Sequence, residues 1–271
     1  MNHVRACPVP RERGHRHHHP EPPHRRNAIN PALGDALLDA LERAESDDEV
    51  RAVVLTGSGG NFCVGAEQSA RANDHERALT KASTTSSRTL LLRFTRLVHF
   101  MYEMNTPTVA EIRGGCAGAG MSLALGCDFR YASTDTVMST AFLKVAFSGD
   151  LGMSWLLTRV VGPARARELL LLSPKVRGDE LLGWGLVNGV SAPDELGDRV
   201  RATARTIADS APVAMRSARQ NLQAALTLSL GDYLPVEGDR LMACAQAKDD
   251  VEEALKAFVE KRPPNFFSAD R

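Results

Sequence analysis

The 271-residue chain contains no apolar run of the roughly 18 residues that a membrane-spanning helix needs. It also has no excess of either charge, since 33 basic residues balance 33 acidic ones, so its overall charge would not draw it to nucleic acid or to an anionic membrane. Its five cysteines are scattered and form no C-x-x-C pair, which argues against a metal site or a disulfide framework. These absences indicate a globular protein of a reducing compartment, and we expect the cytoplasm.

Residues 1–24 lack the apolar segment of a secretory signal. They are rich in His, Arg and Pro, a composition typical of disorder. The HRHHH run at 15–19 could bind a metal ion, but we favour a disordered tail. The rest of the chain divides into a predicted core domain over 25–195 and a predicted C-terminal helical region over 196–271.

The spacing of apolar residues predicts an α/β core followed by helices. Asn30 and Pro31 are typical of a helix start, and VRAVVLTG at 50–57 is typical of a buried strand that ends in a glycine turn. A helix over 86–102, a strand over 106–114 and a helix over 120–126 follow, with FRYAS and TVMST as short strand candidates. Later helices are expected near 150–161, 163–172, 194–209, 212–228 and 234–260.

The stretch GGCAGAGMSLALGCD, residues 114–128, places small residues between a predicted strand and a predicted helix. It is not a dinucleotide-binding fingerprint, because Leu123 stands where the third glycine of G-x-G-x-x-G would be, and it is not a P-loop, because no G-K-[ST] follows. The N–H groups at a helix start can bind an anion or stabilise a developing oxyanion. Tight packing of small residues is the alternative interpretation.

A second glycine-rich turn, GSGGNFCVGAE at 57–67, follows the first predicted strand. Two such turns beyond two strands of one sheet could bring two N–H donors to one carbonyl oxygen. Acyl-transfer and enolate chemistry needs this arrangement. The two turns together therefore predict a site more specifically than either turn alone.

Several motifs, in this order, resemble the enoyl-CoA hydratase/isomerase (crotonase) superfamily: RRNAIN at 25–30, NFCVGAE at 61–67, the 114–128 stretch, FSGDLGMSWLLTRVVGPARARELLL from 147, GDELLGWGLVNGV from 178 and AFVEKRPPNF from 257. The resemblance implies a crotonase-like α/β spiral of ββα units with a C-terminal helical trimerisation region. It also implies an acyl-CoA thioester as substrate, no metal and no cofactor beyond that coenzyme A, and self-association to a homotrimer or a dimer of trimers.

The resemblance assigns the two oxyanion-stabilising N–H groups to Ala66 and Ala119. It places further acyl-CoA contacts in the RRNAIN segment, in both glycine turns, in the segment before residue 150 and on the last helix. The residues expected there are Arg25, Arg26, Ala28, Val64, Glu67, Gln68, Gly115, Gly118, Phe142, Val145, Gly149, Phe258 and Lys261.

The chain departs from the pattern of a hydratase of this superfamily, which uses two glutamates. Ser122 and Phe142 stand at those positions, and neither is a carboxylate. Asp150, in the sequence SGD, sits where some isomerases and a dehalogenase of the superfamily carry a catalytic aspartate. The alternative is that Asp150 only caps the following helix.

The sequence around Asp150 is apolar, with Phe147, Leu151, Met153 and Trp155 close by. Such surroundings predict a raised pKa for the Asp150 carboxyl, which suits an acid/base near neutral pH. We also expect an apolar acyl pocket lined by Met138, Phe142, Val145 and Trp155.

A single acid/base favours a double-bond shift, because hydration generally needs acid and base work on two carbons. The first alternative is a hydratase that uses Asp150 with Ser122. A second alternative is an acyl-CoA-binding homologue without catalysis, and a third, weaker one is nucleic-acid binding through the basic tail.

Members of the superfamily begin with a hairpin just before the RRNAIN position. Here ERGHRHHHPEPPH, at 12–24, stands in its place, and its prolines and histidines do not suit a sheet strand. We therefore expect that hairpin to be missing or irregular.

Overall fold

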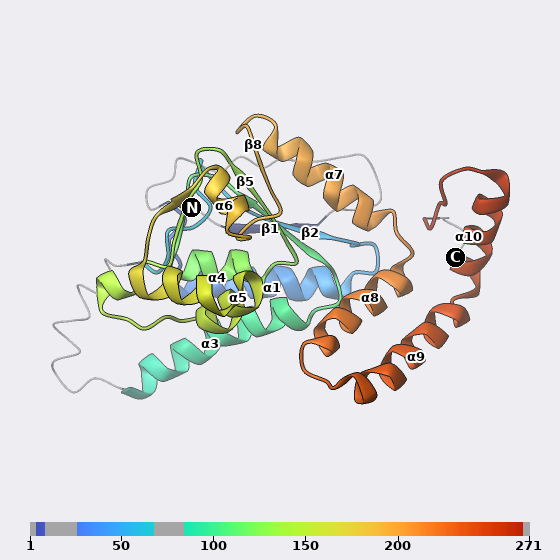
Figure 1. Cartoon of the computed structure of the whole chain (residues 1–271), viewed down its shortest axis with the longest axis horizontal. Coiled ribbons are helices and arrows are strands. Elements are labelled where there is room, and N and C mark those ends of the chain that lie inside the picture. The colour runs from blue at the N-terminus through green and yellow to red at the C-terminus, as the bar shows by residue number, and fades with distance from the viewer. Residues whose placement is uncertain (1–3, 9–25, 68–83, 268–271) are drawn as a thin grey trace.

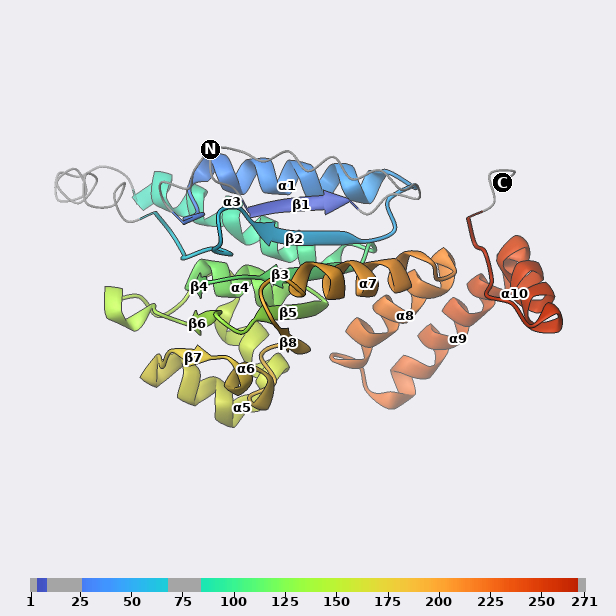
Figure 2. The same ribbon diagram turned by 90° about the horizontal axis from the view of Figure 1, so that it is seen from above.

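The computed structural model describes residues 4–8, 26–67 and 84–267, with backbone only for 4–8 and for most of 84–93. It is built on two sheets that are joined and covered by helices (Figures 1 and 2). The larger sheet has the strand order β1-β2-β3-β5-β8 and the smaller one β4-β6-β7. In the larger sheet β1 is antiparallel to β2 and the other strands are parallel. The predicted α/β class is confirmed.

The strands are β1 Val4–Pro8, β2 Val53–Gly57, β3 Thr108–Ile112, β4 Gly115–Ala117, β5 Phe129–Ser133, β6 Val137–Ser139, β7 Val176–Arg177 and β8 Gly189–Ser191. The helices are α1 Pro31–Ser46, α3 Thr84–Glu103, α4 Ala119–Gly126, α5 Met153–Leu172, α6 Asp179–Gly183, α7 Leu196–Ala208, α8 Pro212–Ala225, α9 Leu230–Gln246 and α10 Lys248–Glu260, with a short 3₁₀ turn η1 at Leu143–Val145.

The two faces of the larger sheet are buried against different helices. Val53 and Leu55 of β2 belong to the main apolar core, which includes residues of α1, α3, α4 and α5. Val54, between them, belongs to a second core in which α7 packs with Leu196, Val200, Ala204 and Ile207. Side chains alternate between the two faces along a strand, so a strand that is buried on both faces has a continuous apolar sequence.

The start of α1 follows its sequence. Pro31 opens the helix, and the Asn30 side chain accepts a hydrogen bond from the Leu33 N–H at 2.9 Å. Helix α4 differs from α1, because every residue from Ala119 to Gly126 is buried and the helix has no polar face. A helix of this kind belongs in a protein core, so α4 holds its N-terminus in a fixed place.

The prediction of a disordered tail over residues 1–24 is wrong for residues 4–8, where β1 pairs along β2 from Val4 opposite Gly57 to Pro8 opposite Val53. The strand covers the edge that β2 would otherwise expose. Its only proline is its last residue, so the pairing loses no interior hydrogen bond. The HRHHH run and the expected hairpin position lie outside the described residues.

The C-terminal helices also differ from the expectation. The sequence predicted one helix over 234–260, but α9 ends at Gln246 and α10 begins at Lys248, with Ala247 between them in a non-helical conformation. Here α8 is fixed to the core by Arg219, whose side chain is 7% exposed and binds the Asp128 carboxylate and the Met101 carbonyl oxygen. Beyond it, α9 and α10 extend away from the sheets (Figure 2). Among the helices of the described part, none is long and apolar enough to cross a membrane.

Candidate active site

The two glycine-rich turns meet, as the sequence predicted. Cys63 and Cys116 form a parallel bridge, and the Ala117 N–H donates to the Cys63 carbonyl oxygen at 2.9 Å. A Cβ built on Gly65 would lie 3.8 Å from the Ala119 nitrogen. Gly65 has a φ of 98°, a conformation that side chains rarely adopt. Glycine therefore allows the first turn to approach the start of α4 closely.

Two backbone N–H groups flank this meeting point. Ala119 is the first residue of α4, so its N–H has no acceptor within the helix. Ala66 forms a parallel bridge with Ile29, which uses the carbonyl of Gly65 and the N–H of Glu67. The Gly65 carbonyl and the Glu67 N–H face Ile29, and backbone groups alternate in direction along an extended segment. The Ala66 N–H, which lies between them, therefore points away from Ile29. The backbone geometry thus provides two donors at neighbouring positions, and the positive end of the α4 dipole lies beside them.

A buried network of hydrogen bonds, which the sequence did not predict, links the two turns to each other and to the segment before α1. Asn27 is fully buried, and its amide nitrogen donates to the carbonyl oxygens of Ser58 at 2.9 Å and Asn61 at 2.6 Å. The Ser58 hydroxyl donates back to the Asn27 side-chain oxygen at 3.0 Å. The Asn61 side-chain oxygen accepts the N–H of Gly115 at 3.0 Å. This network joins the RRNAIN segment to both turns.

The signal for this network was present in the sequence but ambiguous. Asn27 has a φ of 56°, and asparagine tolerates this left-handed region better than most residues. An asparagine beside a glycine turn also suits an exposed loop, so its burial could not be inferred from its type.

Two buried thiols, Cys63 and Cys116, lie on the two turns of the site, and a third, Cys127, follows the far end of α4. Cys63, Cys116 and Cys127 are buried, and burial raises the pKa of Cys63 and of Cys127 to about 12 and that of Cys116 well above its ordinary value. The thiolate is the nucleophilic form of cysteine. These side chains are therefore packing groups at neutral pH.

Ser122, at one of the two expected glutamate positions, is fully buried in α4. Its hydroxyl donates to the backbone carbonyl oxygen of Asp150 at 3.1 Å. This hydrogen bond connects α4, which carries the Ala119 N–H, to the segment that carries the Asp150 carboxylate. The sequence indicates both residues as candidates but does not predict the contact between them.

Asp150 does not occupy the cap of the helix that follows it. The N-cap position of α5 belongs to Gly152, and Asp150 contributes its backbone carbonyl, which accepts the Met153 N–H at 2.9 Å. The interpretation of Asp150 as a side-chain cap is therefore wrong. The raised pKa of its carboxyl stays a prediction.

Phe142, at the other expected glutamate position, lies beside both segments. Its side chain is 7% exposed, and a Cβ built on Gly118 or on Gly149 would lie 3.9 or 4.0 Å from its ring. Phe142 thus separates the start of α4 from the loop that leads to Asp150. An aromatic ring at this point can shape an apolar pocket but cannot transfer a proton.

The other predicted pocket residues are dispersed. Met138 is fully buried in the main core, and Val145 is 42% exposed on η1. The Trp155 ring packs edge-on against Tyr102 at 4.9 Å between centroids, and the Arg159 guanidinium lies 3.5 Å from its centroid. Trp155 is therefore engaged with α3 and with its own helix. Of the apolar neighbours expected around Asp150, Leu151 and Met153 are buried, but Phe147 is 47% exposed.

The expected coenzyme A contacts fall into two groups. The first group lies on the segments that form the site and consists of Arg26, Ala28, Val64, Glu67 and Gly115. These segments are hydrogen-bonded to each other, since the Val64 N–H donates to the Arg26 carbonyl oxygen at 3.3 Å and the Glu67 N–H donates to the Ile29 carbonyl oxygen at 2.9 Å. Arg25 and Gln68 lie outside the described residues.

The second group lies on the last helix. Phe258 of α10 is 83% exposed, and Lys261 directly follows the helix. Both views place α10 at one end of the molecule, with α8 and α9 between it and α4 (Figures 1 and 2). One chain therefore does not bring these two residues to its own site.

Comparison with known proteins agrees with this geometry. The family model described as enoyl-CoA hydratase/isomerase matches residues 20–269. The 1,2-epoxyphenylacetyl-CoA isomerase of Escherichia coli is 31% identical, with 90% of this chain and 91% of the relative covered. The short-chain-enoyl-CoA hydratase of Clostridium acetobutylicum is 28% identical, with 88% and 89% covered.

Solved structures show the same similarity. The crystal structure of an enoyl-CoA hydratase from Bacillus anthracis superposes with a TM-score of 0.82 at 27% identity, covering 89% of this chain and 91% of that one. The family match spans nearly the whole chain and includes both turns of the site. The protein therefore belongs to the enoyl-CoA hydratase/isomerase family, whose members act on acyl-CoA thioesters.

Proposed function

We propose that the protein is an enoyl-CoA isomerase that moves a double bond from the Δ3 to the Δ2 position, with Asp150 as the acid/base. The carboxylate removes a proton from the α-carbon of the 3-enoyl thioester, which forms a conjugated dienolate. It then returns the proton to the γ-carbon, so the double bond shifts and no atom is gained or lost. The observation that supports this best is the hydrogen bond from Ser122 to the Asp150 carbonyl, which ties the proposed base to the proposed oxyanion helix.

The thioester oxygen lies between the N–H groups of Ala66 and Ala119 in this proposal. Negative charge develops on that oxygen when the α-proton leaves, and two fixed donors stabilise the charge without reorganisation. Removing one such donor typically costs about 10²–10³ in rate. The start of α4 adds the favourable end of a helix dipole.

Isomerisation fits the groups at the two hydratase positions better than hydration does. Phe142 has no proton to give, and the Ser122 hydroxyl is already donated to a carbonyl oxygen. Asp150 would therefore work alone, and one group that moves a proton between two carbons of one ligand suffices for a double-bond shift. Hydration also requires a group that activates water.

The proposal includes the binding residues expected from the sequence. Arg25, Arg26, Ala28, Val64, Glu67 and Gln68, with Gly115, Gly118 and Gly149, contact the thioester and the coenzyme A, while Phe142 and Val145 face the acyl group. No cofactor is needed beyond the coenzyme A of the substrate. Self-association to a trimer or a dimer of trimers brings Phe258 and Lys261 of one copy to the site of another.

The test is the Asp150→Asn variant, which keeps the size of the side chain and removes the base. We expect acyl-CoA binding by calorimetry close to wild type and a loss of double-bond migration of at least about 10²-fold, the lower range for acid/base catalysis. Asp194→Asn, at an exposed position, is the matched control. Undiminished turnover in Asp150→Asn would remove the proposal, and binding without turnover in wild type would favour the non-catalytic alternative.

A hydratase that uses Asp150 with Ser122 is the second candidate, because the two residues are in contact. Ser122→Ala separates the two functions. It should leave a double-bond shift measurable if the hydroxyl only anchors the Asp150 segment. It should abolish hydration if the hydroxyl takes part in the chemistry.

A further inference from the structure

The segment that leads into α1 lies directly against the turn that carries Ala66. The Ile29 N–H donates to the Gly65 carbonyl oxygen at 2.7 Å, and the Glu67 N–H donates to the Ile29 carbonyl oxygen at 2.9 Å. Ile29 is buried and belongs to the main apolar core. The residues on both sides of Ala66 are therefore bonded to a fixed segment, while Ala66 itself stays partly exposed.

A side-chain hydrogen bond joins the same two segments. The Asn30 amide nitrogen donates to the Glu67 carboxylate at 3.2 Å, while the Asn30 amide oxygen accepts the Leu33 N–H at 2.9 Å. The bond from Leu33 fixes the orientation of the amide, because only the amide oxygen can accept an N–H. Asn30 therefore has two roles, since it caps α1 and also holds the carboxylate that follows Ala66.

The negative charge of Glu67 suits this position. The N-terminus of a helix carries partial positive charge and favours an anion, and the first turn of α1 contains no acidic residue. Glu67 supplies this anion from another segment. The helix end and the Asn30 amide in turn compensate the carboxylate, which matters because an uncompensated negative charge beside Ala66 would oppose a developing enolate.

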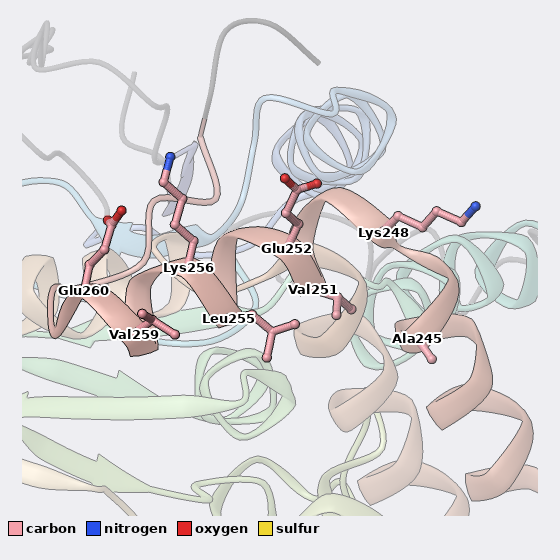
Figure 3. Close-up of a pocket in the computed structure, with 8 residues that line it drawn as sticks. All are labelled: Ala245, Lys248, Val251, Glu252, Leu255, Lys256, Val259 and Glu260. Carbon is pink, nitrogen blue, oxygen red and sulfur yellow. The ribbon is translucent and has the colours of Figure 1, made fainter.

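The groove along α10 does not involve these segments. It has a volume of about 560 Å³ and is lined by Ala245 of α9 and by side chains of α10 (Figure 3). None of its lining residues belongs to the two turns or to the segment before α1. Within one chain, the turn that carries Ala66 is therefore held by the segments that contact it and not by the last helix.

We propose that Asn30 and Glu67 are positioning residues for the Ala66 N–H, and that they act through the hydrogen bond between their side chains. The inference rests on the proposed function, in which this N–H binds the thioester oxygen. When the side-chain bond is lost, the turn is held only by the backbone bonds to Ile29, and the direction of the Ala66 N–H is less well fixed. This role is separate from the coenzyme A contact expected of Glu67.

Asn30→Asp breaks the side-chain bond and keeps the cap of α1, since aspartate and asparagine cap helices about equally well. The new carboxylate cannot donate to Glu67 and repels it. A misplacement of about 1 Å can cost about 10²-fold in rate. Because the backbone bonds to Ile29 remain, we expect a smaller loss, of about tenfold, in kcat for the double-bond shift. KM should change by less than about twofold, because the donor acts on charge that develops in the transition state.

The double variant Asn30→Asp/Glu67→Gln tests whether the bond itself is responsible. The glutamine amide can donate to the aspartate, so the same bond forms with donor and acceptor exchanged. We expect kcat of the double variant to be at least about fivefold higher than that of Asn30→Asp, the non-additivity of two residues in contact. Asp39→Asn, which changes an exposed carboxylate further along α1, should match wild type.

Hydrogen exchange of the Glu67 amide and urea unfolding complete the experiment. The Glu67 N–H should exchange faster in Asn30→Asp and regain protection in the double variant, while the free energy of unfolding of Asn30→Asp should stay close to that of wild type. An unchanged kcat in Asn30→Asp would overturn the proposal, and so would a double variant as slow as the single one.

Failure of the proposed function gives a different result. Wild type would then bind acyl-CoA without shifting its double bond, and the exchange of the Glu67 amide would still decide whether the pair of side chains positions the turn. Faster exchange in Asn30→Asp that the double variant reverses would support the pair. Exchange at the wild-type rate in Asn30→Asp would overturn it.

Discussion

Gly120 on α4 decides how closely the two halves of the proposed oxyanion site approach each other. A Cβ at this position would lie 2.1 Å from the Cys63 carbonyl oxygen and 2.7 Å from the Cys63 Cβ. Relief of that overlap requires a movement of about 1 Å, and Cys63 lies on the turn that carries Ala66. We therefore expect Gly120→Ala to separate the Ala66 and Ala119 N–H groups. A misplacement of about 1 Å can cost about 10²-fold in rate.

Gly126, at the other end of α4, is the matched control. A Cβ there would meet only the ends of the Met101 and Val98 side chains, both at 3.8 Å, which is ordinary contact. Replacement of a helical glycine by alanine gains up to about 1 kcal/mol of helix propensity. Gly126→Ala should therefore be as stable as wild type or slightly more stable.

The assay measures turnover, acyl-CoA affinity and urea unfolding for both variants. Gly120→Ala should lose about 1–3 kcal/mol of stability, the usual cost of overpacking a core, and should lose turnover even where it is fully folded. Gly126→Ala should keep both properties. If Gly120→Ala turned over at the wild-type rate, the two turns would not need their close approach, and the assignment of the two donors would be refuted.

Three further predictions concern other parts of the chain. Asn61→Leu should lower turnover about tenfold, because the Gly115 N–H loses its acceptor and an unsatisfied buried amide costs about 1–3 kcal/mol. Asn61→Asp keeps an acceptor oxygen and should retain activity. Hydrogen bonds from Arg262 and Asn265 lower the pKa of Glu253 to about 2, so its contribution to stability is present above pH 4.5 and is lost as the pH falls toward 2. Urea unfolding at pH 7, 4 and 2 should show this loss in wild type and not in Glu253→Gln. Cys63 should resist iodoacetamide at pH 8 in the native protein and react after unfolding, while Cys244, which is partly exposed, should react in both; peptide mapping by mass spectrometry distinguishes them.

The sequence was most informative where local chemistry decides the structure. Asn30 and Pro31 predicted the start of α1, and the two glycine turns predicted a meeting point because parallel strands deliver their following turns to one edge. Small residues and positive φ angles leave little choice at these positions. The motifs also predicted the family, which the comparisons confirmed.

The remaining features depend on contacts between distant segments. Asn27 and Ser58 are 31 residues apart, and nothing local distinguishes a buried asparagine from one in an exposed turn. The strand at Val4–Pro8 forms because β2 offers an edge, which the composition of the tail does not reveal. Trp155 was expected in the pocket from its position in sequence, but its ring packs against Tyr102, which comes from another helix.

The measurement that most directly tests the central claim is the reaction of a 3-enoyl-CoA in water enriched in ¹⁸O. The account predicts the 2-enoyl isomer as the first product, with no heavy oxygen by mass spectrometry, and a loss of this product in Asp150→Asn. A 3-hydroxyacyl-CoA that carries ¹⁸O and forms without prior accumulation of the 2-enoyl isomer would contradict it. The enzyme would then add a water oxygen to the acyl chain, which a proton shift by Asp150 does not do.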